Sequence, residues 1–292
     1  MDISLKLFIT YFNINSFLDK LDNFRKLDLR TITNIELQKE IIDVISVQFG
    51  NSQISHLLRI VRKIEKGTNL YRIRKIERHD LEYPLKSMRR QTDAWNPPNN
   101  IIKKMGRLNK VGESLLYVSL NPKAAMKEMK IQENDRFALI VYEAKEEIKA
   151  INIGVENNLD KFGFLEEEKA KVRLIERFLC DEFTRDVGEG TEFLYRASEM
   201  IAKDYFDLPP GAVQDAWCYQ SVASKQEINL CFRPTLARKK MKLRGVIICK
   251  CVQGEILCEQ IVYGYKNNGI FNYFPIGSDI QREVFPEITN GF

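Results

Sequence analysis

Residues 106–128 hold the densest group of side chains in this sequence that could perform chemistry. They read Gly-Arg-Leu-Asn-Lys-Val-Gly over 106–112, an apolar run over 115–119, and Asn-Pro-Lys-Ala-Ala-Met-Lys-Glu over 121–128. The pattern predicts a loop, a strand and a helix in which Asn121 is the N-cap and Pro122 the first residue. Glu128 then lies about two turns into the helix, near small alanines that leave room for a ligand. The alternative interpretation is a solvated glutamate.

Several common catalytic patterns are missing. Gly188-Glu-Gly190 does not continue into a dinucleotide fingerprint, and neither a phosphate-binding Gly-Lys-Ser/Thr nor a Gly-x-Ser-x-Gly elbow occurs. The two histidines, His56 and His79, and the six cysteines lack the spacing of a zinc site, so we expect no metal and reduced thiols. Acid, base and electrostatic work must therefore fall to carboxylates, tyrosines and arginines.

Charge is unevenly distributed along the 292 residues. The net charge is +5, but residues 72–110 alone contain eleven lysines or arginines against four acidic residues. Such an excess attracts a phosphate-bearing partner, either nucleic acid or a nucleotide. The alternative is a solvated basic surface.

The elements that must position these residues divide into two parts. Residues 1–66 are predicted to be helical, because three stretches have apolar residues at helical spacing. These residues are Ile14, Phe17, Leu18, Leu21 and Phe24, then Leu37, Ile41, Val44 and Ile45, then Ile54, Leu57, Leu58, Val61 and Ile64. Thr33 and Glu36 have the spacing of a capping box, and Gly50 is expected to end that second helix. We expect this region to pack on the rest of the protein or to form an interface with a second copy or a protein partner.

Residues 67–292 have an α+β pattern, without the regular alternation of a doubly wound sheet. Strands are predicted at 70–75, 114–119, 137–143, 147–153, 217–221, 228–232, 245–251 and 255–265, and helices at 166–183 and 192–206. Gln253 and Gly254 are predicted to join the last two strands in a hairpin of a largely antiparallel set. The sequence has no apolar run of about 20 residues and no signal-peptide pattern, so we expect a cytoplasmic protein without a membrane anchor.

Four separated motifs resemble the RES domain family. They are the aromatic-Arg strand with Tyr71 and Arg72, the Gly-Arg-Leu-Asn loop with Arg107 and Asn109, the strand and helix with Tyr117 and Glu128, and Tyr219-Gln-Ser221 followed by Asn229-Leu-Cys-Phe-Arg-Pro. The resemblance covers residues 69–234. The sequence departs from the family at Lys110, where proline or serine is frequent, and at Gln220, where proline usually precedes the serine.

The resemblance implies a fold like that of diphtheria-toxin-type ADP-ribosyltransferases and an enzyme that consumes NAD as its substrate. Members are commonly the growth-arresting toxin of a bacterial toxin-antitoxin pair, so a cognate antitoxin is an expected partner. The expected reaction is cleavage of the nicotinamide-ribose bond, as an NAD glycohydrolase or phosphorylase. Protein ADP-ribosylation is the alternative, and a nucleic-acid-binding module built on residues 72–110 is a disfavoured alternative of another class.

The resemblance also implies roles for individual residues. Arg107 and, as a second anchor, Arg72 would bind the pyrophosphate, since guanidinium groups bind phosphate in a bidentate manner. Glu128 would stabilise positive charge on the ribose or orient its 2′-hydroxyl. Tyr117 would stack on or hydrogen-bond the nicotinamide ribose. Ser221 would bind the nicotinamide end or position Glu128. Asn109 and Asn229 complete the expected NAD-binding set.

Overall fold

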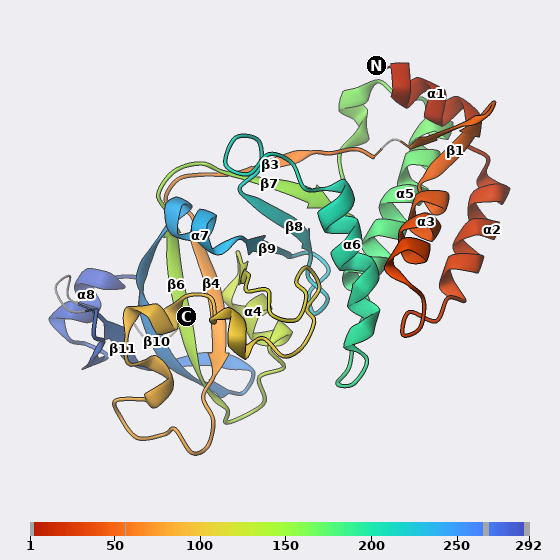
Figure 1. The fold of residues 1–292 in the computed structure, drawn as a ribbon. Coiled ribbons are helices and arrows are strands. Elements are labelled where there is room, and N and C mark those ends of the chain that lie inside the picture. Colours follow the sequence, from red (N-terminus) through yellow and green to blue (C-terminus); the bar gives the residue numbers. More distant parts are fainter. Residues whose placement is uncertain (1–2, 56, 265–268, 289–292) are drawn as a thin grey trace.

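A computed structural model describes residues 3–55, 57–264 and 269–288 (Figure 1). Its main feature is a ten-stranded mixed sheet in the order β12-β11-β10-β6-β4-β5-β9-β8-β7-β3, in which β7 and β8 are parallel and the other neighbours antiparallel. The strands are β3 (Val61–Ile64), β4 (Asn69–Lys75), β5 (Leu116–Ser119), β6 (Arg136–Ala144), β7 (Ile148–Ile153), β8 (Ala216–Gln220), β9 (Ile228–Phe232), β10 (Met241–Val252), β11 (Glu255–Tyr263) and β12 (Asn272–Pro275). The predicted α+β class is confirmed.

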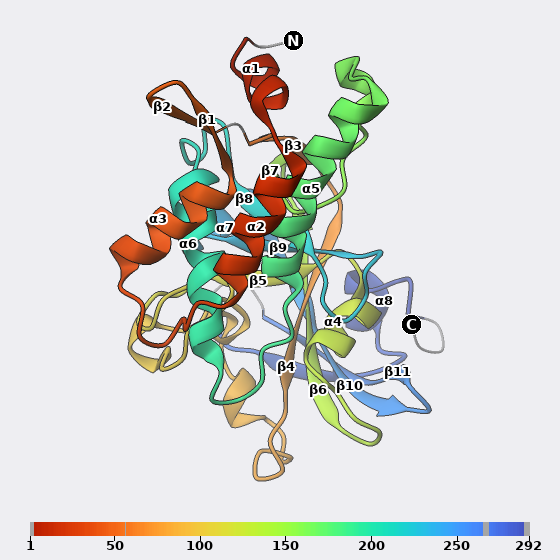
Figure 2. The same cartoon turned by 90° about the vertical axis from the view of Figure 1, so that its right-hand side faces the viewer.

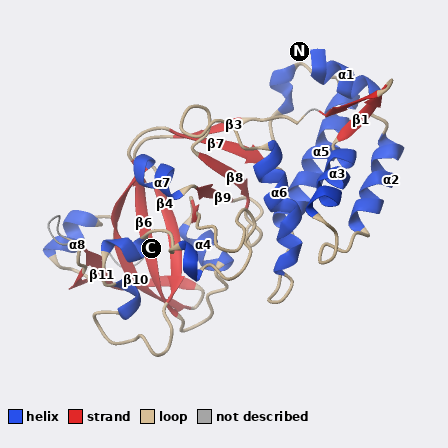
Figure 3. Cartoon of the chain, in the orientation of Figure 1, coloured by secondary structure: helices blue, strands red, loops and turns tan. Residues whose placement is uncertain are grey.

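Some helices form a group on one side of the molecule and others lie beside the large sheet, as the colouring by secondary structure shows (Figure 3). They are α1 (Ile3–Tyr11), α2 (Ile14–Arg25), α3 (Asn34–Val44), α4 (Pro122–Glu128), α5 (Glu166–Thr184), α6 (Tyr195–Tyr205), α7 (Pro234–Lys240) and α8 (Asp279–Val284). The capping box predicted for α3 is present, because Thr33 Oγ1 accepts from Glu36 N while the Glu36 carboxylate accepts from Thr33 N. The turn between β10 and β11 is also as predicted: Gln253 and Gly254 both have positive φ, as a two-residue type I′ hairpin turn requires.

The large sheet is almost divided between β4 and β5. These two strands are paired only at Tyr71 and Ser119, whereas β4 pairs with β6 along its whole length and β5 pairs with β9 along its whole length. We call this line between β4 and β5 the seam. Strands β12, β11, β10, β6 and β4 lie on one side of it, and the other five lie on the opposite side (Figure 1). Helix α4 follows β5 directly and lies near the seam.

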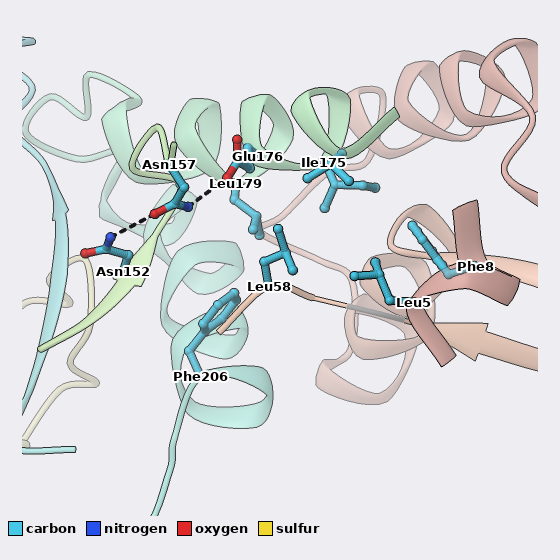
Figure 4. A pocket seen from close by; sticks show the side chains of 11 residues that line it. Leu5, Phe8, Leu58, Asn152, Asn157, Ile175, Glu176, Leu179 and Phe206 are labelled. Carbon is cyan, nitrogen blue, oxygen red and sulfur yellow. Dashed lines mark hydrogen bonds between the residues drawn. The ribbon is translucent and has the colours of Figure 1, made fainter. Parts of the chain in front are cut away.

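The N-terminal helices pack against α5 and α6, as the view turned by 90° shows (Figure 2). Phe24 of α2 meets Phe178 of α5 edge to face, with ring centres 5.4 Å apart. At the α1 end, Leu5 and Phe8 lie across a small cavity from Ile175 of α5 (Figure 4). The apolar faces of the N-terminal helices therefore share one buried core with α5, α6 and residues of β7, β8 and β9.

The prediction of a third N-terminal helix within residues 52–66 is wrong. This segment contains β2 (Ser52–Ser55), which pairs with β1 (Ser46–Phe49) in a separate two-stranded sheet, and β3, which joins the large sheet beside β7. The second predicted helix ends at Val44 rather than near Gly50, because β1 begins at Ser46. The helical part of the N-terminal region therefore stops at Val44, and β3 belongs to the sheet of the main body.

The cysteines form no disulfide bond. All six cysteines are free thiols, and four of them are buried. His79 is exposed, while His56 lies outside the described residues. Within the described ranges there is no group of three or more histidine, cysteine or acidic side chains that could hold a metal, and no helix there is long and apolar enough to cross a bilayer.

Candidate active site

A pocket of about 370 Å³ opens at the seam. We call it the seam pocket. Its walls come from β4, β5, α4, the loop before β5, the start of α6, β8 and β9. The residues that line it are Tyr71, Arg72, Ile73, Gly106, Arg107, Tyr117, Val118, Ser119, Ala125, Glu128, Met129, Tyr195, Tyr219 and Asn229. The divergence of β4 from β5 leaves this space in the middle of the sheet, where side chains from both halves meet.

Glu128 enters the pocket from the last turn of α4. The helix begins where the sequence predicts, because Asn121 Oδ1 accepts hydrogen bonds from Lys123 N and Ala124 N and Pro122 is its first residue. Ala125, one turn before Glu128, also lines the pocket. Its small side chain keeps this face of α4 free of bulk.

Hydrogen bonds orient the Glu128 carboxylate. Oε1 accepts from Ser221 Oγ at 2.5 Å, from Val222 N at 2.9 Å and from Asn229 Nδ2 at 2.9 Å, with Ala223 N at 3.5 Å. Among the described residues, none donates to Oε2. One oxygen is therefore held by the protein, while the other can receive a hydrogen bond from a ligand or face a developing positive charge.

Arg107 is the buried cation of the pocket, with 9% of its surface exposed. Nη2 donates to the Arg185 carbonyl oxygen at 3.2 Å, while Nη1 is buried without a hydrogen-bond partner. The guanidinium carbon lies 5.0 Å from the centre of the Tyr195 ring and 6.0 Å from that of Tyr219. Within the described part of the chain no carboxylate comes within 4.0 Å of this guanidinium. An unpaired buried charge is costly, so the arrangement favours binding of an anion.

The loop that carries Arg107 is held by Tyr117 and Asn109. The Tyr117 hydroxyl accepts from Leu108 N at 3.1 Å and donates to Asn109 Oδ1 at 2.8 Å. Gly106 N donates to the Asn109 carbonyl, and a Cβ at position 106 would lie 2.3 Å from Asn109 Oδ1, so a larger residue there would displace the Asn109 side chain from Tyr117. Burial raises the pKa of the Tyr117 phenol well above its ordinary value, which keeps the hydroxyl a donor at neutral pH.

Replacing Tyr117 by phenylalanine should therefore destabilise the protein. The change leaves a buried backbone N–H and a buried amide oxygen without their partner, and we expect a loss of about 1–3 kcal/mol of unfolding free energy in urea denaturation. Tyr11→Phe is the control: Tyr11 is 47% exposed and should change stability by less than about 0.5 kcal/mol. Equal stabilities of the two variants would contradict this role of the hydroxyl.

Ser221 lies where it can fill one of the two roles expected of it. It is fully buried and does not line the pocket; it lies behind Glu128, to which it donates. Its Oγ also accepts from Ser224 N, which closes the turn after β8. Of the two roles considered for Ser221, its position fits the positioning of Glu128 and not direct contact with a ligand in the pocket.

Arg72 and Asn229 both line the pocket. Arg72 reaches it from β4 and donates from Nη1 to the Trp95 carbonyl oxygen at 3.0 Å. Asn229 reaches it from β9, where it pairs with Ser119 across the sheet. Asn109 does not line the pocket, and its side chain contacts the Tyr117 hydroxyl on β5 and the Lys110 carbonyl oxygen in the loop. The structure therefore brings Arg72, Arg107, Tyr117, Glu128 and Asn229 together, with Asn109 and Ser221 supporting them from outside.

Sequence reasoning missed Tyr195 and Tyr219, the two rings beside Arg107. Tyr219 is part of the Tyr-Gln-Ser motif, so the motif itself was a signal for it. Tyr195 lies in a segment predicted only as a helix, and its contact with Arg107 depends on how α6 docks. Burial raises the pKa of both phenols, that of Tyr219 most strongly, so both rings remain neutral beside the guanidinium.

Several basic residues of segment 72–110 contact other groups of the protein, whereas Arg78, Lys86, Arg89, Arg90 and Lys103 are exposed. Three lysines of the segment form ion pairs within 4.0 Å. Lys75 pairs with Asp135, Lys104 pairs with Glu189 and Glu192, and Lys110 pairs with Glu199. Arg74, like Arg72, donates to a main-chain carbonyl. Arg72 and Arg107 both line the seam pocket, and of these two Arg107 is the one with a buried guanidinium nitrogen that has no hydrogen-bond partner in the described structure.

No protein-family model, curated protein or solved structure matches the chain.

Proposed function

We propose that the protein consumes NAD by cleaving its nicotinamide-ribose bond in the seam pocket. The observation that carries the proposal is the pairing of Arg107, a buried guanidinium without an anionic partner, with Glu128, a carboxylate oriented through one oxygen, on the walls of one pocket. A dinucleotide offers both groups a partner: the pyrophosphate is an anion for Arg107, and the ribose becomes positively charged as the bond breaks.

Cleavage of the nicotinamide-ribose bond needs few protein side chains. The electron pair of the C1′–N bond leaves with the pyridinium nitrogen as neutral nicotinamide, and the ribose passes through an oxocarbenium-like state, as in glycoside hydrolysis. Glu128 stabilises that charge. Water then forms the new C1′–O bond and releases a proton, which gives ADP-ribose. Inorganic phosphate as the acceptor gives ADP-ribose 1″-phosphate instead.

The proposal also includes a more specific fold and a family for the protein. A sheet split at its centre, with a carboxylate reaching the gap from a short helix, supports a core like that of diphtheria-toxin-type ADP-ribosyltransferases, as in the RES domain family. The four motifs of the resemblance converge on the seam pocket or directly behind it, which supports the family assignment further. In that setting the protein acts as a growth-arresting toxin, and a cognate antitoxin is its partner.

Incubation of the purified protein with NAD tests the proposal. We expect release of free nicotinamide, which chromatography detects. The second product is ADP-ribose or, in phosphate buffer, its phosphorylated form. A parallel reaction with a cell extract and labelled NAD reports label transferred to protein. Millimolar NAD that stays intact over hours under all three conditions would overturn the proposed function.

A further inference from the structure

Arg196 ties the N-terminal helices to the start of α6. Its Nη1 donates to the Leu29 carbonyl oxygen at 2.6 Å, and its Nη2 donates to the Ile32 carbonyl oxygen and to Asn34 Oδ1, both at 2.7 Å. Leu29 and Ile32 belong to the α2–α3 loop (residues 26–33), and Asn34 is the first residue of α3. One guanidinium on α6 therefore holds both the loop and the beginning of the helix that follows it.

A second contact reinforces this link. The Arg30 guanidinium lies over the Phe193 ring, with its carbon 4.5 Å from the ring centre. Phe193 is in the single 3₁₀ turn (Glu192–Leu194) that leads into α6. The α2–α3 loop thus contacts the chain on both sides of Tyr195 in the sequence.

The first turn of α6 in turn holds Arg107. Tyr195 places its ring 5.0 Å from the guanidinium carbon, and Ser198 Oγ donates to the Arg107 carbonyl oxygen at 2.9 Å. Ser198 is 1% exposed, so this hydrogen bond is shielded from water. Arg196 lies between these two residues and points to the N-terminal helices, while its neighbours contact the pocket arginine.

We propose that the α2–α3 loop positions the anion-binding side of the seam pocket, with Arg196 as the positioning residue that transmits this contact through Tyr195 and Ser198 to Arg107. The N-terminal helices then act on ligand affinity without placing a side chain in the pocket. Whatever displaces the loop from Arg196 weakens binding of an anionic ligand. The consequence for NAD turnover rests on the proposed function, whereas the effect on the Arg107 loop does not.

The test compares the full-length Arg196→Gln variant with a variant that removes a hydrogen bond between α3 and the other end of α6. Gln38 of α3 donates to Asp204, near the end of α6, at 2.9 Å, so Gln38→Ala is the matched control. Hydrogen exchange followed by mass spectrometry reports on residues 104–109, where Leu108 N–H and Gly106 N–H are hydrogen-bonded. Steady-state kinetics with NAD supply KM and kcat for each variant.

For Arg196→Gln we expect exchange in residues 104–109 to rise and the KM for NAD to increase, each by about three- to thirtyfold, with kcat within about twofold of that of the wild type. Gln38→Ala should leave both quantities within about twofold. Asn34→Ala removes one of the three hydrogen-bond acceptors of Arg196. It should raise the exchange and the KM as well, but by less than Arg196→Gln does. If Arg196→Gln does not fold, the result for Asn34→Ala decides the question.

Unchanged exchange in residues 104–109, with faster exchange confined to α2 and α3, would mean that Arg196 only anchors the N-terminal helices, and the inference would be overturned. A rise in exchange in a protein that leaves NAD intact would support the positioning role and count against the proposed function alone.

Discussion

The Glu128→Gln variant should cleave NAD about 10²- to 10⁴-fold more slowly than the wild type, which corresponds to about 3–5 kcal/mol of activation free energy. The amide cannot stabilise the positive charge that develops on the ribose. It can still accept through Oε1 the hydrogen bonds from Ser221 and Asn229, so the melting temperature should stay nearly unchanged. The measurements are kcat from nicotinamide release and Tm from a thermal scan.

Glu227→Gln is the control for this prediction. Glu227 lies in the loop between β8 and β9, close in sequence to the residues that hold Glu128, and its carboxylate accepts from Asn121 Nδ2 at 2.9 Å without lining the seam pocket. We expect its turnover to remain near that of the wild type. Full turnover in Glu128→Gln would remove Glu128 from the reaction, and a loss common to both variants would point to damage of the loop instead.

Arg107→Ala should instead weaken binding of NAD. A hydrogen-bonded contact between a guanidinium and a phosphate contributes about 1.5–3 kcal/mol, so we expect KM to rise by about 10- to 100-fold with a smaller change in kcat. The protein itself should lose little stability, because the substitution also removes a buried charge that has no anionic partner in the described structure. Calorimetric titration with ADP-ribose, which lacks the scissile bond, measures the affinity directly.

Arg233→Ala is the matched arginine control. Its guanidinium also lies over an aromatic ring, that of Trp217 at 4.5 Å, but it is paired with Asp207 at 2.6 Å and lies outside the seam pocket. Its loss should leave the affinity for ADP-ribose unchanged. An Arg107→Ala variant that binds ADP-ribose as tightly as Arg233→Ala does would show that the anion site lies elsewhere.

The parts of the fold that could be predicted are those that depend on neighbours in the sequence. Asn121 and Pro122 begin α4 through contacts within one turn, and Gln253 and Gly254 form a hairpin turn through their own backbone angles. The candidate site residues between Gly106 and Glu128 could be predicted for a similar reason. A loop, a strand and a short helix that follow one another directly place their side chains close together. Interactions between residues close in the sequence were sufficient to predict these features.

The rest depends on partners far away in the sequence. Val61 and Ile64 have helical spacing with the residues before them, yet they form β3 because β7, almost ninety positions later, offers a free sheet edge. The position of Ser221 behind Glu128 is set by the turn after β8, and the contact of Tyr195 with Arg107 is set by the docking of α6. No pattern within either segment contains that information.

The single pairing of Tyr71 with Ser119 also makes the seam mechanically compliant. In an ordinary sheet, widening a gap between two strands breaks a row of main-chain hydrogen bonds, but here a small hinge-like rotation of one half against the other strains the ladder at one point only. The separation of Glu128, which α4 carries beside β5, from Arg72 on β4 is therefore governed by side-chain packing around the seam. Substitutions at Ile73 or Met129, which line the pocket and have no role in the proposed reaction, should change the width of the pocket while leaving Arg107 and Glu128 in place.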